Sequence, residues 1–382
     1  MSLLTPRSSP LSSPFAHNNQ SVRRLMFKVQ LAVIPALLVH LYLFGFGIII
    51  QWVLAFATLI LVELSMLKLR NRPVRPFITD MSAMITATVL VFCIPAGAPW
   101  WIIVSGTAFA LIFGKHIYGG LGYNPFNPAM LGYAFLLLSF PVQMTQWTAP
   151  TEILDYSVNF TNTLNLIFTG HQPETAMDMI SAATPLSQLQ TGLTQGQGVT
   201  ESLGPITQEA QTHYMNGSFV NGFFYTTAQF FSLNSWAWVN VAFLIGGLWL
   251  LAVRAIRWQY PVGFLSSLTL ISLIFYTIDP NTYPPVDFML LSGGTMLAAF
   301  FIITDPVTSS TTPKGRFIFA CGIGILVYVI RTWGLFPDGI TFAILLMNIA
   351  VPLIDQYTQP RVYGHKNKIG GGENDKTHNI IL

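Results

Sequence analysis

Long apolar runs, separated by short polar or Gly- and Pro-rich turns, dominate the pattern of hydrophobic positions along this chain. A transmembrane helix needs roughly 20 consecutive apolar residues, and ten runs approach that length. We therefore predict an all-α integral membrane protein with about ten spans. The predicted spans are residues 29–47, 48–67, 81–97, 99–117, 128–145, 237–256, 260–278, 286–304, 317–333 and 340–357.

The composition agrees with a chain that lies mostly in a lipid bilayer. Hydrophobic residues make up 52% of the 382 residues and charged residues only 9%, whereas a soluble domain carries about 25% charged residues. The polar N-terminal segment lacks the apolar core of a cleavable signal peptide. We therefore expect the chain to insert through its own helices, and we expect no nucleic-acid partner.

The distribution of basic residues predicts the orientation of the chain. With ten spans, all but one of the 18 Lys and Arg residues fall on the same side of the membrane, and the exception is Arg331. Because basic connections stay in the cytoplasm, both terminal tails, residues 1–28 and 358–382, should be cytoplasmic. Residues 145–235 contain no Lys or Arg and should form an external, loosely structured domain.

The external segment divides the predicted spans into two sets of five. Residues 29–145 and 237–357 should then form repeats of inverted topology, joined by the loop domain 146–236. Transporters with this plan place a site at the membrane midplane between broken helices, and the plan resembles that of urea and ammonium channels. We expect the breaks at "GGLGYNPFNPAM", just after Lys115, and at "GLFPDGI", just after Arg331.

Several redox and nucleotide sites require residues or motifs that this chain lacks. The two cysteines, Cys93 and Cys321, stand alone in apolar spans, so the chain by itself cannot supply a four-cysteine iron–sulfur cluster. His40 lies within one span and His116 at the end of another, which favours structural histidines over a bis-histidine haem. Neither a dinucleotide-binding motif in its required context nor a P-loop occurs, so we expect no NAD binding and no ATP hydrolysis.

Four ionisable residues in or beside the spans are candidates for an ion path or a ligand contact. Glu63 is a candidate by its depth, although Lys68 indicates instead an acid near the cytoplasmic boundary with a basic partner. Asp305 begins a turn, and the Ser/Thr run after it could cap a short re-entrant helix or coordinate a cation. Arg331 could hold a phosphate or carboxylate, or satisfy carbonyl groups at a helix break. Lys115 precedes the other expected break.

A short motif in the external segment predicts a modified threonine. The stretch "DMISAAT", from Asp178 to Thr184, is similar to the D-x-x-[ST]-G-A-T signature of proteins that carry FMN through a phosphoester to the threonine. Ala182 stands where glycine is usual. We expect Thr184 on an exposed loop, away from the spans. A second match, "SGGT" at 292–295, has no acid three positions earlier and lies inside a predicted span, where its glycines would permit close helix contact.

Three longer stretches resemble a single family of membrane subunits. They are "YGGLGYNPFNPAMLGYAFLLLSFPVQMT", "LLSGGTMLAAFFIITDPVTSSTTPKGR" and "FPDGITFAILLMNIAVPLIDQYTQPRVYGH". They closely resemble the D subunits of the Rnf (also Rsx) ion-translocating electron-transport complexes, and the likeness covers nearly all ten spans. The B subunit of the sodium-pumping NADH:quinone oxidoreductase is a more distant likeness. The "RVYGH" ending and the short N-terminus favour the Rnf family.

The resemblance implies a multi-pass subunit of the bacterial inner membrane that works with the A, B, C, E and G subunits of the Rnf complex and is not catalytic alone. Such complexes pass electrons between ferredoxin and NAD and move Na⁺ or H⁺. It also implies FMN on Thr184, attached by a periplasmic flavin transferase, and relatives hold a further non-covalent riboflavin. A channel or transporter of the same architecture, and a structural scaffold for partner subunits, stay open as alternatives.

Overall fold

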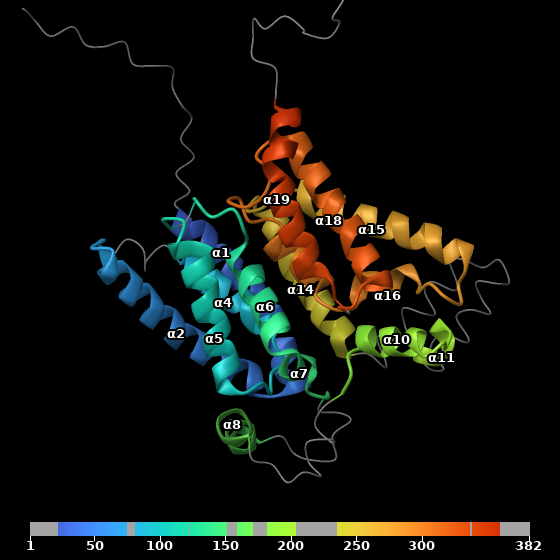
Figure 1. Ribbon diagram of the computed structural model, residues 1–382, viewed down its shortest axis with the longest axis horizontal. Helices are drawn as coiled ribbons and strands as arrows, with labels where there is room; N and C mark the ends of the chain where they lie inside the picture. The colour runs from blue at the N-terminus through green and yellow to red at the C-terminus, as the bar shows by residue number, and fades with distance from the viewer. Residues whose placement is uncertain are drawn as a thin grey trace, which may run out of the picture.

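The structure is a computed structural model, and it describes residues 22–74, 81–120, 122–150, 159–170, 182–203, 235–336 and 338–359. These residues form helices and their connections (Figure 1). The first set consists of α1 (Val22–Phe44), α2 (Gly47–Leu69), α4 (Ser82–Cys93), α5 (Trp100–Leu111), the π-helical turn η1 (Ile112–His116), α6 (Pro128–Ser139) and α7 (Pro141–Thr145).

The second set follows three helices from the predicted external segment. Those three are α8 (Phe160–Thr169), α10 (Pro185–Thr194) and α11 (Val199–Leu203). The second set consists of α14 (Ser235–Ala252), α15 (Gln259–Ile278), α16 (Val286–Leu291), α17 (Thr295–Leu297), the π-helical turn η2 (Ala298–Ile302), α18 (Pro313–Trp333) and α19 (Ile340–Thr358).

Among the described residues, six helices are long and apolar enough to cross a membrane, namely α1, α2, α14, α15, α18 and α19. This agrees with a multi-pass membrane protein. The other four predicted spans contain shorter helices. The span expected over 81–97 is helical only to Cys93, after which Ile94 is extended.

The span expected over 286–304 is not continuous, which corrects the sequence-based expectation. It is interrupted at Gly293, whose φ of +58° lies in a region that glycine adopts without steric cost. The side chain of Asn240, on α14, donates to the carbonyls of Leu291 (2.9 Å) and Gly293 (2.8 Å) and accepts from the amide of Met296 (3.1 Å). Within a membrane such freed backbone groups need a protein partner. Gly293 therefore serves the break, and its lack of a side chain also permits the close approach of Leu186 on α10.

The two sets of helices lie side by side, the first on the left and the second on the right in Figure 1. They meet where α1 crosses α14 and where α6 contacts α19. The first crossing is close, because a Cβ atom built on Gly246 would lie 2.0 Å from the carbonyl oxygen of Ala32. One apolar core joins α1 to the helices of the second set.

The helices of the predicted external segment lie at one end of the molecule. In Figure 1, α10 and α11 lie at the lower end, whereas α1 begins and α19 ends at the upper end. The apolar side chains of Leu186 and Leu189 on α10 pack with Ala237 on α14 and Phe288 on α16. The described residues 182–203 are therefore ordered helix packed on the spans, where the sequence favoured loose structure.

Candidate functional site

Thr184 lies immediately before α10 and caps that helix. Its extended backbone (φ −65°, ψ 154°) leads into Pro185 at the first helical position, which proline favours because it has no amide hydrogen to satisfy there. The Thr184 hydroxyl oxygen accepts from the Ser187 amide at 3.3 Å and lies 3.0 Å from the Ser187 hydroxyl. Thr184 is half-buried beside the spans. The expectation of an exposed loop away from the spans was wrong, because α10 has an apolar face that packs inward.

Contacts with three parts of the second set hold α10 in place. Leu186 and Leu189 pack on α14 and α16. Leu186 also lies against the break at Gly293, where an added Cβ atom would come within 2.7 Å of its Cδ1. The side-chain amide of Gln190 donates to the carbonyl of Gly334, just after α18, at 2.7 Å. The position of Thr184 is thus fixed relative to the helix break.

A cavity of about 300 Å³ opens beside Thr184, and we call it the Thr184 cavity. Its volume is at the lower end of the range for ligand pockets. Both sets of helices contribute to its largely apolar wall, whose aromatic residues are His40, Phe92, Tyr133, Trp147, Trp236, Phe243, Phe336 and Phe342. The rings of Trp147 and Trp236 meet edge to face, with centroids 5.0 Å apart. Such a cavity suits a planar, largely apolar ligand with a polar anchor at its rim.

Arg331 lies behind the wall of this cavity and holds Asp338, which lines it. Its buried guanidinium donates to the carbonyl of Met289 (2.9 Å), the hydroxyl of Thr295 (3.0 Å) and a carboxylate oxygen of Asp338 (2.6 Å). The other Asp338 oxygen accepts from the Gly294 amide at 3.2 Å. The geometry includes both roles expected for Arg331, because its guanidinium pairs with a carboxylate, that of Asp338, and also satisfies backbone groups at the helix break. Thr295, the threonine of "SGGT", is fully buried within this network.

Glu63 and Lys115 form a buried ion pair. The Lys115 ammonium also donates to the hydroxyl of Ser82 at 3.2 Å, and His116 Nε2 lies 3.6 Å from the paired Glu63 oxygen. Lys68, the partner that the sequence indicated, is exposed. That expectation was wrong because helix packing brings Lys115, 52 positions away, to the buried face of α2 that carries Glu63.

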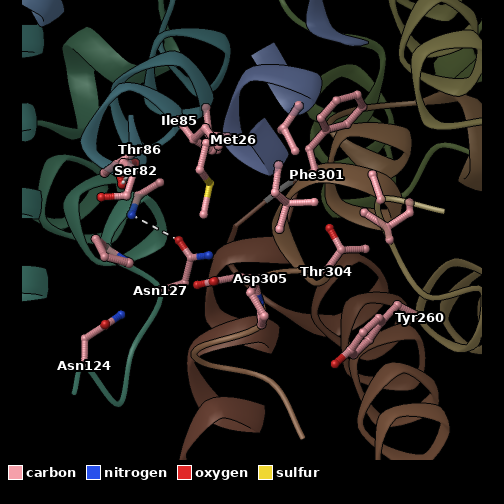
Figure 2. A pocket seen from close by; sticks show the side chains of 18 of the residues that line it. Met26, Ser82, Ile85, Thr86, Asn124, Asn127, Tyr260, Phe301, Thr304 and Asp305 are labelled. Carbon is pink, nitrogen blue, oxygen red and sulfur yellow. Dashed lines mark hydrogen bonds between the residues drawn. The ribbon is translucent and has the colours of Figure 1, made fainter. Parts of the chain in front are cut away.

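A second cavity, of about 360 Å³, lies between the two sets of helices, and we call it the Asn127 cavity. Figure 2 shows Asn124 and Asn127 facing Thr304, Asp305 and Tyr260 across it. Its remaining polar wall includes Ser82, Thr86, Lys115, Arg257 and Arg316. The Glu63–Lys115 pair therefore borders this cavity through Lys115. Within the described ranges, no group of three or more His, Cys, Asp or Glu side chains is placed to hold a metal ion.

Asp305 organises the turn that follows η2. Its carboxylate accepts from the Val307 amide (3.2 Å) and the Thr308 hydroxyl (3.0 Å). Burial raises the pKa of Asp305 above its usual value, and these two hydrogen bonds oppose that rise. Within the Ser/Thr run, Thr312 caps α18 by accepting from the Gly315 amide at 2.9 Å. The run thus caps a long helix and not a short re-entrant one.

Several residues in or near the wall of the Thr184 cavity were not identified by the sequence analysis. Ser187 had a local signal, because a Thr-Pro-x-Ser sequence is typical of a capped helix start. Asp338 had a weaker local signal: it is an acidic residue only seven positions after Arg331, close enough along the chain to pair with it. Asn240, beside the helix break, gave none, because its partners lie more than 50 positions away along the chain. Asp178 and Ser181 of the threonine motif, and the basic residues after 360, lie outside the described residues.

Comparisons with known proteins identify the family. Residues 10–364 match the NQR2, RnfD, RnfE family. Relatives named as the D subunit of an ion-translocating oxidoreductase complex include those of Escherichia fergusonii (46% identical over 363 residues) and Yersinia pseudotuberculosis (47% over 364). Another, from Pectobacterium carotovorum, is 48% identical over 363 residues. Each alignment covers 93% of this chain and 98% of the relative. The chain therefore belongs to the NQR2, RnfD, RnfE family.

Proposed function

We propose that this chain is the D subunit of an ion-translocating oxidoreductase complex and carries FMN, bonded to Thr184, as an electron relay. The names of its relatives support the first part. A single structural observation carries the second: the Thr184 hydroxyl lies at the rim of an aromatic cavity between the two sets of helices. The chain would serve as a non-catalytic part of a complex that moves electrons between ferredoxin and NAD.

The surroundings of Thr184 fit a phosphoester. An anion at the start of a helix is stabilised by the helix dipole and by free backbone amides, and α10 begins directly after Thr184. The Ser187 amide, which donates to the Thr184 hydroxyl oxygen, is a donor for a phosphate there, and the Ser187 hydroxyl, which donates to the Thr184 carbonyl at 2.8 Å, lies beside it. When bound, FMN supplies the reversible uptake of electrons, and the chain's residues hold its phosphate and enclose its ring.

This chain does not supply the residues for an iron–sulfur cluster or an NAD site, so we assign those sites to the A, B, C, E and G subunits of such a complex. Its two cysteines, Cys93 and Cys321, lie on helices of different sets, so iron–sulfur clusters and the NAD site would belong to those partners. A periplasmic flavin transferase would modify Thr184. The half-buried hydroxyl beside exposed Ala183 offers access to such an enzyme, whereas fully buried Thr295 does not.

The same proposal includes ten spans in an inverted five-plus-five arrangement, like that of urea and ammonium channels. Each predicted span contains helix at its expected place, and the four short or broken ones would be completed across the bilayer by their partner helices. The halves would be 29–145 and 237–357, with the periplasmic segment 146–236 between them. The tails 1–28 and 358–382 would lie in the cytoplasm beneath a bacterial inner membrane.

We place the ion path near the Asn127 cavity. Lys115 and Asp305 both line it, and Glu63 reaches it through its ion pair with Lys115. Acidic groups buried within a membrane protein typically mark the path of a cation such as Na⁺ or H⁺. The Asn127 cavity is also where we place a non-covalent riboflavin, because its asparagine amides and hydroxyls offer both donors and acceptors. Arg331 would act on the Thr184 cavity indirectly, by holding Asp338.

The test of the covalent flavin uses three variants of the full chain, each produced together with the transferase. Thr184→Val removes the only atom of that side chain that can form a phosphoester and should abolish in-gel flavin fluorescence under denaturing conditions. Thr184→Ser keeps a hydroxyl and should retain fluorescence, as should Thr295→Val. Membrane insertion should be normal in all three. Fluorescence that survives Thr184→Val and disappears in Thr295→Val would assign the flavin to the other threonine.

The same measurement separates the alternatives. A channel or transporter of this architecture, or a scaffold, needs no bound flavin, so an unmodified wild-type chain of expected intact mass would favour them. A protein like the B subunit of a sodium-pumping NADH:quinone oxidoreductase would also carry the flavin. It would differ in its electron donor and acceptor, which assays of the assembled complex with ferredoxin and with quinone would distinguish.

A further inference from the structure

Helix α8 (Phe160–Thr169) covers little of its apolar surface with protein. Of its 10 residues, Thr163 and Ile167 are the buried ones. Phe160 is 50% exposed and Phe168 is 45% exposed, and no residue of the helix is charged. An isolated helix of this length is only marginally stable in water. A further apolar surface is therefore needed to cover the exposed side of α8.

The exposed apolar side chains of α8 lie along one side of the helix. Phe160, Leu164 and Phe168 recur every four positions, so they follow one another on the same face. The stripe one position later is polar and exposed, and it consists of Thr161, Asn165 and Thr169. The helix is therefore amphipathic, with an apolar side that the described residues leave open.

α8 lies at the level where the spans end. A Cβ atom built on Gly97, in the turn before α5, would lie 3.2 Å from Cδ2 of Leu166. Trp100, at the start of α5, is 41% exposed, and so are Trp238 near the start of α14 (49%) and Trp333 at the end of α18 (55%). Tryptophan is enriched where a membrane meets water. These three side chains therefore mark the bilayer surface at the end of the molecule where α8 lies.

The direction of α8 and its neighbours favour lipid as the covering surface. In Figure 1, α8 is seen nearly end-on at the lower end, whereas α2, α5 and α6 are seen from the side, so α8 runs across the direction of the spans. The ring of Phe46, itself 42% exposed, meets that of Phe160 edge to face with centroids 5.8 Å apart. Phe46 precedes α2, whose exposed apolar residues include Val53, Ile60 and Leu61. The open side of α8 thus continues the outward side of a helix long enough to cross the membrane.

We propose that α8 lies flat in the bilayer surface at this end of the molecule, with Phe160 and Phe168 inserted between phospholipids. Under the proposed topology this is the periplasmic surface. Helices of this kind bury an apolar face at the boundary of headgroups and acyl chains and keep a polar face in water. Because α8 has no Lys or Arg, the contact is apolar and needs no anionic headgroup.

This contact gives the segment between the two sets of helices a second attachment. α10 is held by the spans through Leu186 and Leu189, whereas α8, earlier in the chain, is held by lipid. The chain ahead of Thr184 is thereby kept close to the bilayer. The inference does not depend on the flavin, because it follows from the exposed surface of α8 alone.

The test introduces a photoreactive benzoylphenylalanine at single positions of the full chain, in cell membranes that contain the assembled complex. Ultraviolet light joins this side chain to its neighbours, and mass spectrometry identifies them. At position 168 the adducts should be phospholipids. At position 169, the matched control on the polar stripe, phospholipid adducts should be at least about tenfold fewer, the factor by which apolar surroundings favour one large apolar side chain.

Two outcomes of this experiment would overturn the inference. Adducts of position 168 with another subunit, or with a distant part of this chain, would show that protein covers the open side of α8. Equal phospholipid yields at positions 168 and 169, or none at either, would show that the helix does not present its apolar side to the bilayer.

A second measurement uses amide hydrogen exchange of the full chain in nanodiscs of neutral phospholipid. Phe160→Ser combined with Phe168→Ser removes the two inserted rings and should speed exchange within α8 at least about tenfold, because local opening becomes easier. Thr161→Ser combined with Thr169→Ser changes the polar stripe and should exchange like the wild type. Equal exchange in the two double variants would contradict the lipid contact.

Discussion

Glu63 and Lys115 form a buried ion pair that the sequence around each residue did not predict. Both are buried, and Ser82 and His116 complete the cluster. Removing one partner of a buried ion pair typically costs about 3–5 kcal/mol, whereas replacing both is often neutral. A change at Glu63 alone therefore mixes a stability effect with any effect on ion movement, and the two must be separated.

Glu63→Gln and Asp305→Asn should each slow or uncouple ion transport in reconstituted complex while in-gel flavin fluorescence stays at the wild-type level. Glu63→Gln should also lower stability by up to about 3–5 kcal/mol, because Lys115 loses its counter-charge. Adding Lys115→Met should restore the melting temperature but not transport. If the double variant recovers both, Glu63 is structural only. Full transport in Asp305→Asn would remove Asp305 from the path.

Among the secondary-structure elements, the interrupted span of α16 and α17 connects the largest number of functional features. Arg331, Asp338 and Asn240 all bind its free backbone groups, and Leu186 of α10 packs against it. Sequence periodicity predicted where helices occur, because the length of an apolar run is a local property. It did not predict the break, because the groups that stabilise it come from α14 and α18, tens of residues away along the chain.

The two adjacent glycines of the break offer a matched pair of substitutions. Gly293→Ala places a Cβ atom 2.6 Å from an Asp338 oxygen and 2.7 Å from Leu186 Cδ1, at a φ of +58°. A left-handed backbone costs a non-glycine residue about 1–2 kcal/mol, and the clashes add to that. The melting temperature and the yield of covalent flavin should both fall, because Asp338 and α10 must move.

Gly294→Ala is the control for that experiment. Its added Cβ atom meets nothing closer than 3.4 Å, and its backbone is ordinary, with a φ of −91°. Its melting temperature and flavin yield should be close to wild type. Equal losses in the two variants would mean that the break tolerates no side chain at all, independent of the contact with Asp338 and Leu186.

At the scale of the whole molecule, both cavities lie between the two sets of helices, so neither site exists in one set alone. The sequence predicts a division into two sets, because a segment without Lys or Arg separates them. It predicted Thr184 through a local motif, but not that α10 folds back onto the second set. That packing depends on Leu186 meeting a surface built by residues a hundred positions further along the chain.

The arrangement of charges also predicts the topology of the molecule in its membrane. Both tails should be cytoplasmic and α10 periplasmic, because then all but Arg331 of the 18 basic residues lie inside. A reporter fused at exposed Gln195, at the end of α10, should signal outside, and one fused at Lys376, beyond the described residues, should signal inside. The same signal from both fusions would contradict the ten-span arrangement.

The placement of Thr184 at the rim of its cavity has a consequence for occupancy. A ring tethered there by a short flexible chain experiences an effective concentration in the millimolar range. An intrinsic Kd of about 1 mM, equivalent to only about −4.1 kcal/mol, then suffices to keep the cavity half filled. Free cofactor at micromolar concentration would leave the same cavity almost empty. The proposed covalent bond would thus remove the need for tight binding by the cavity wall and leave its side chains free to adjust the reduction potential of the flavin.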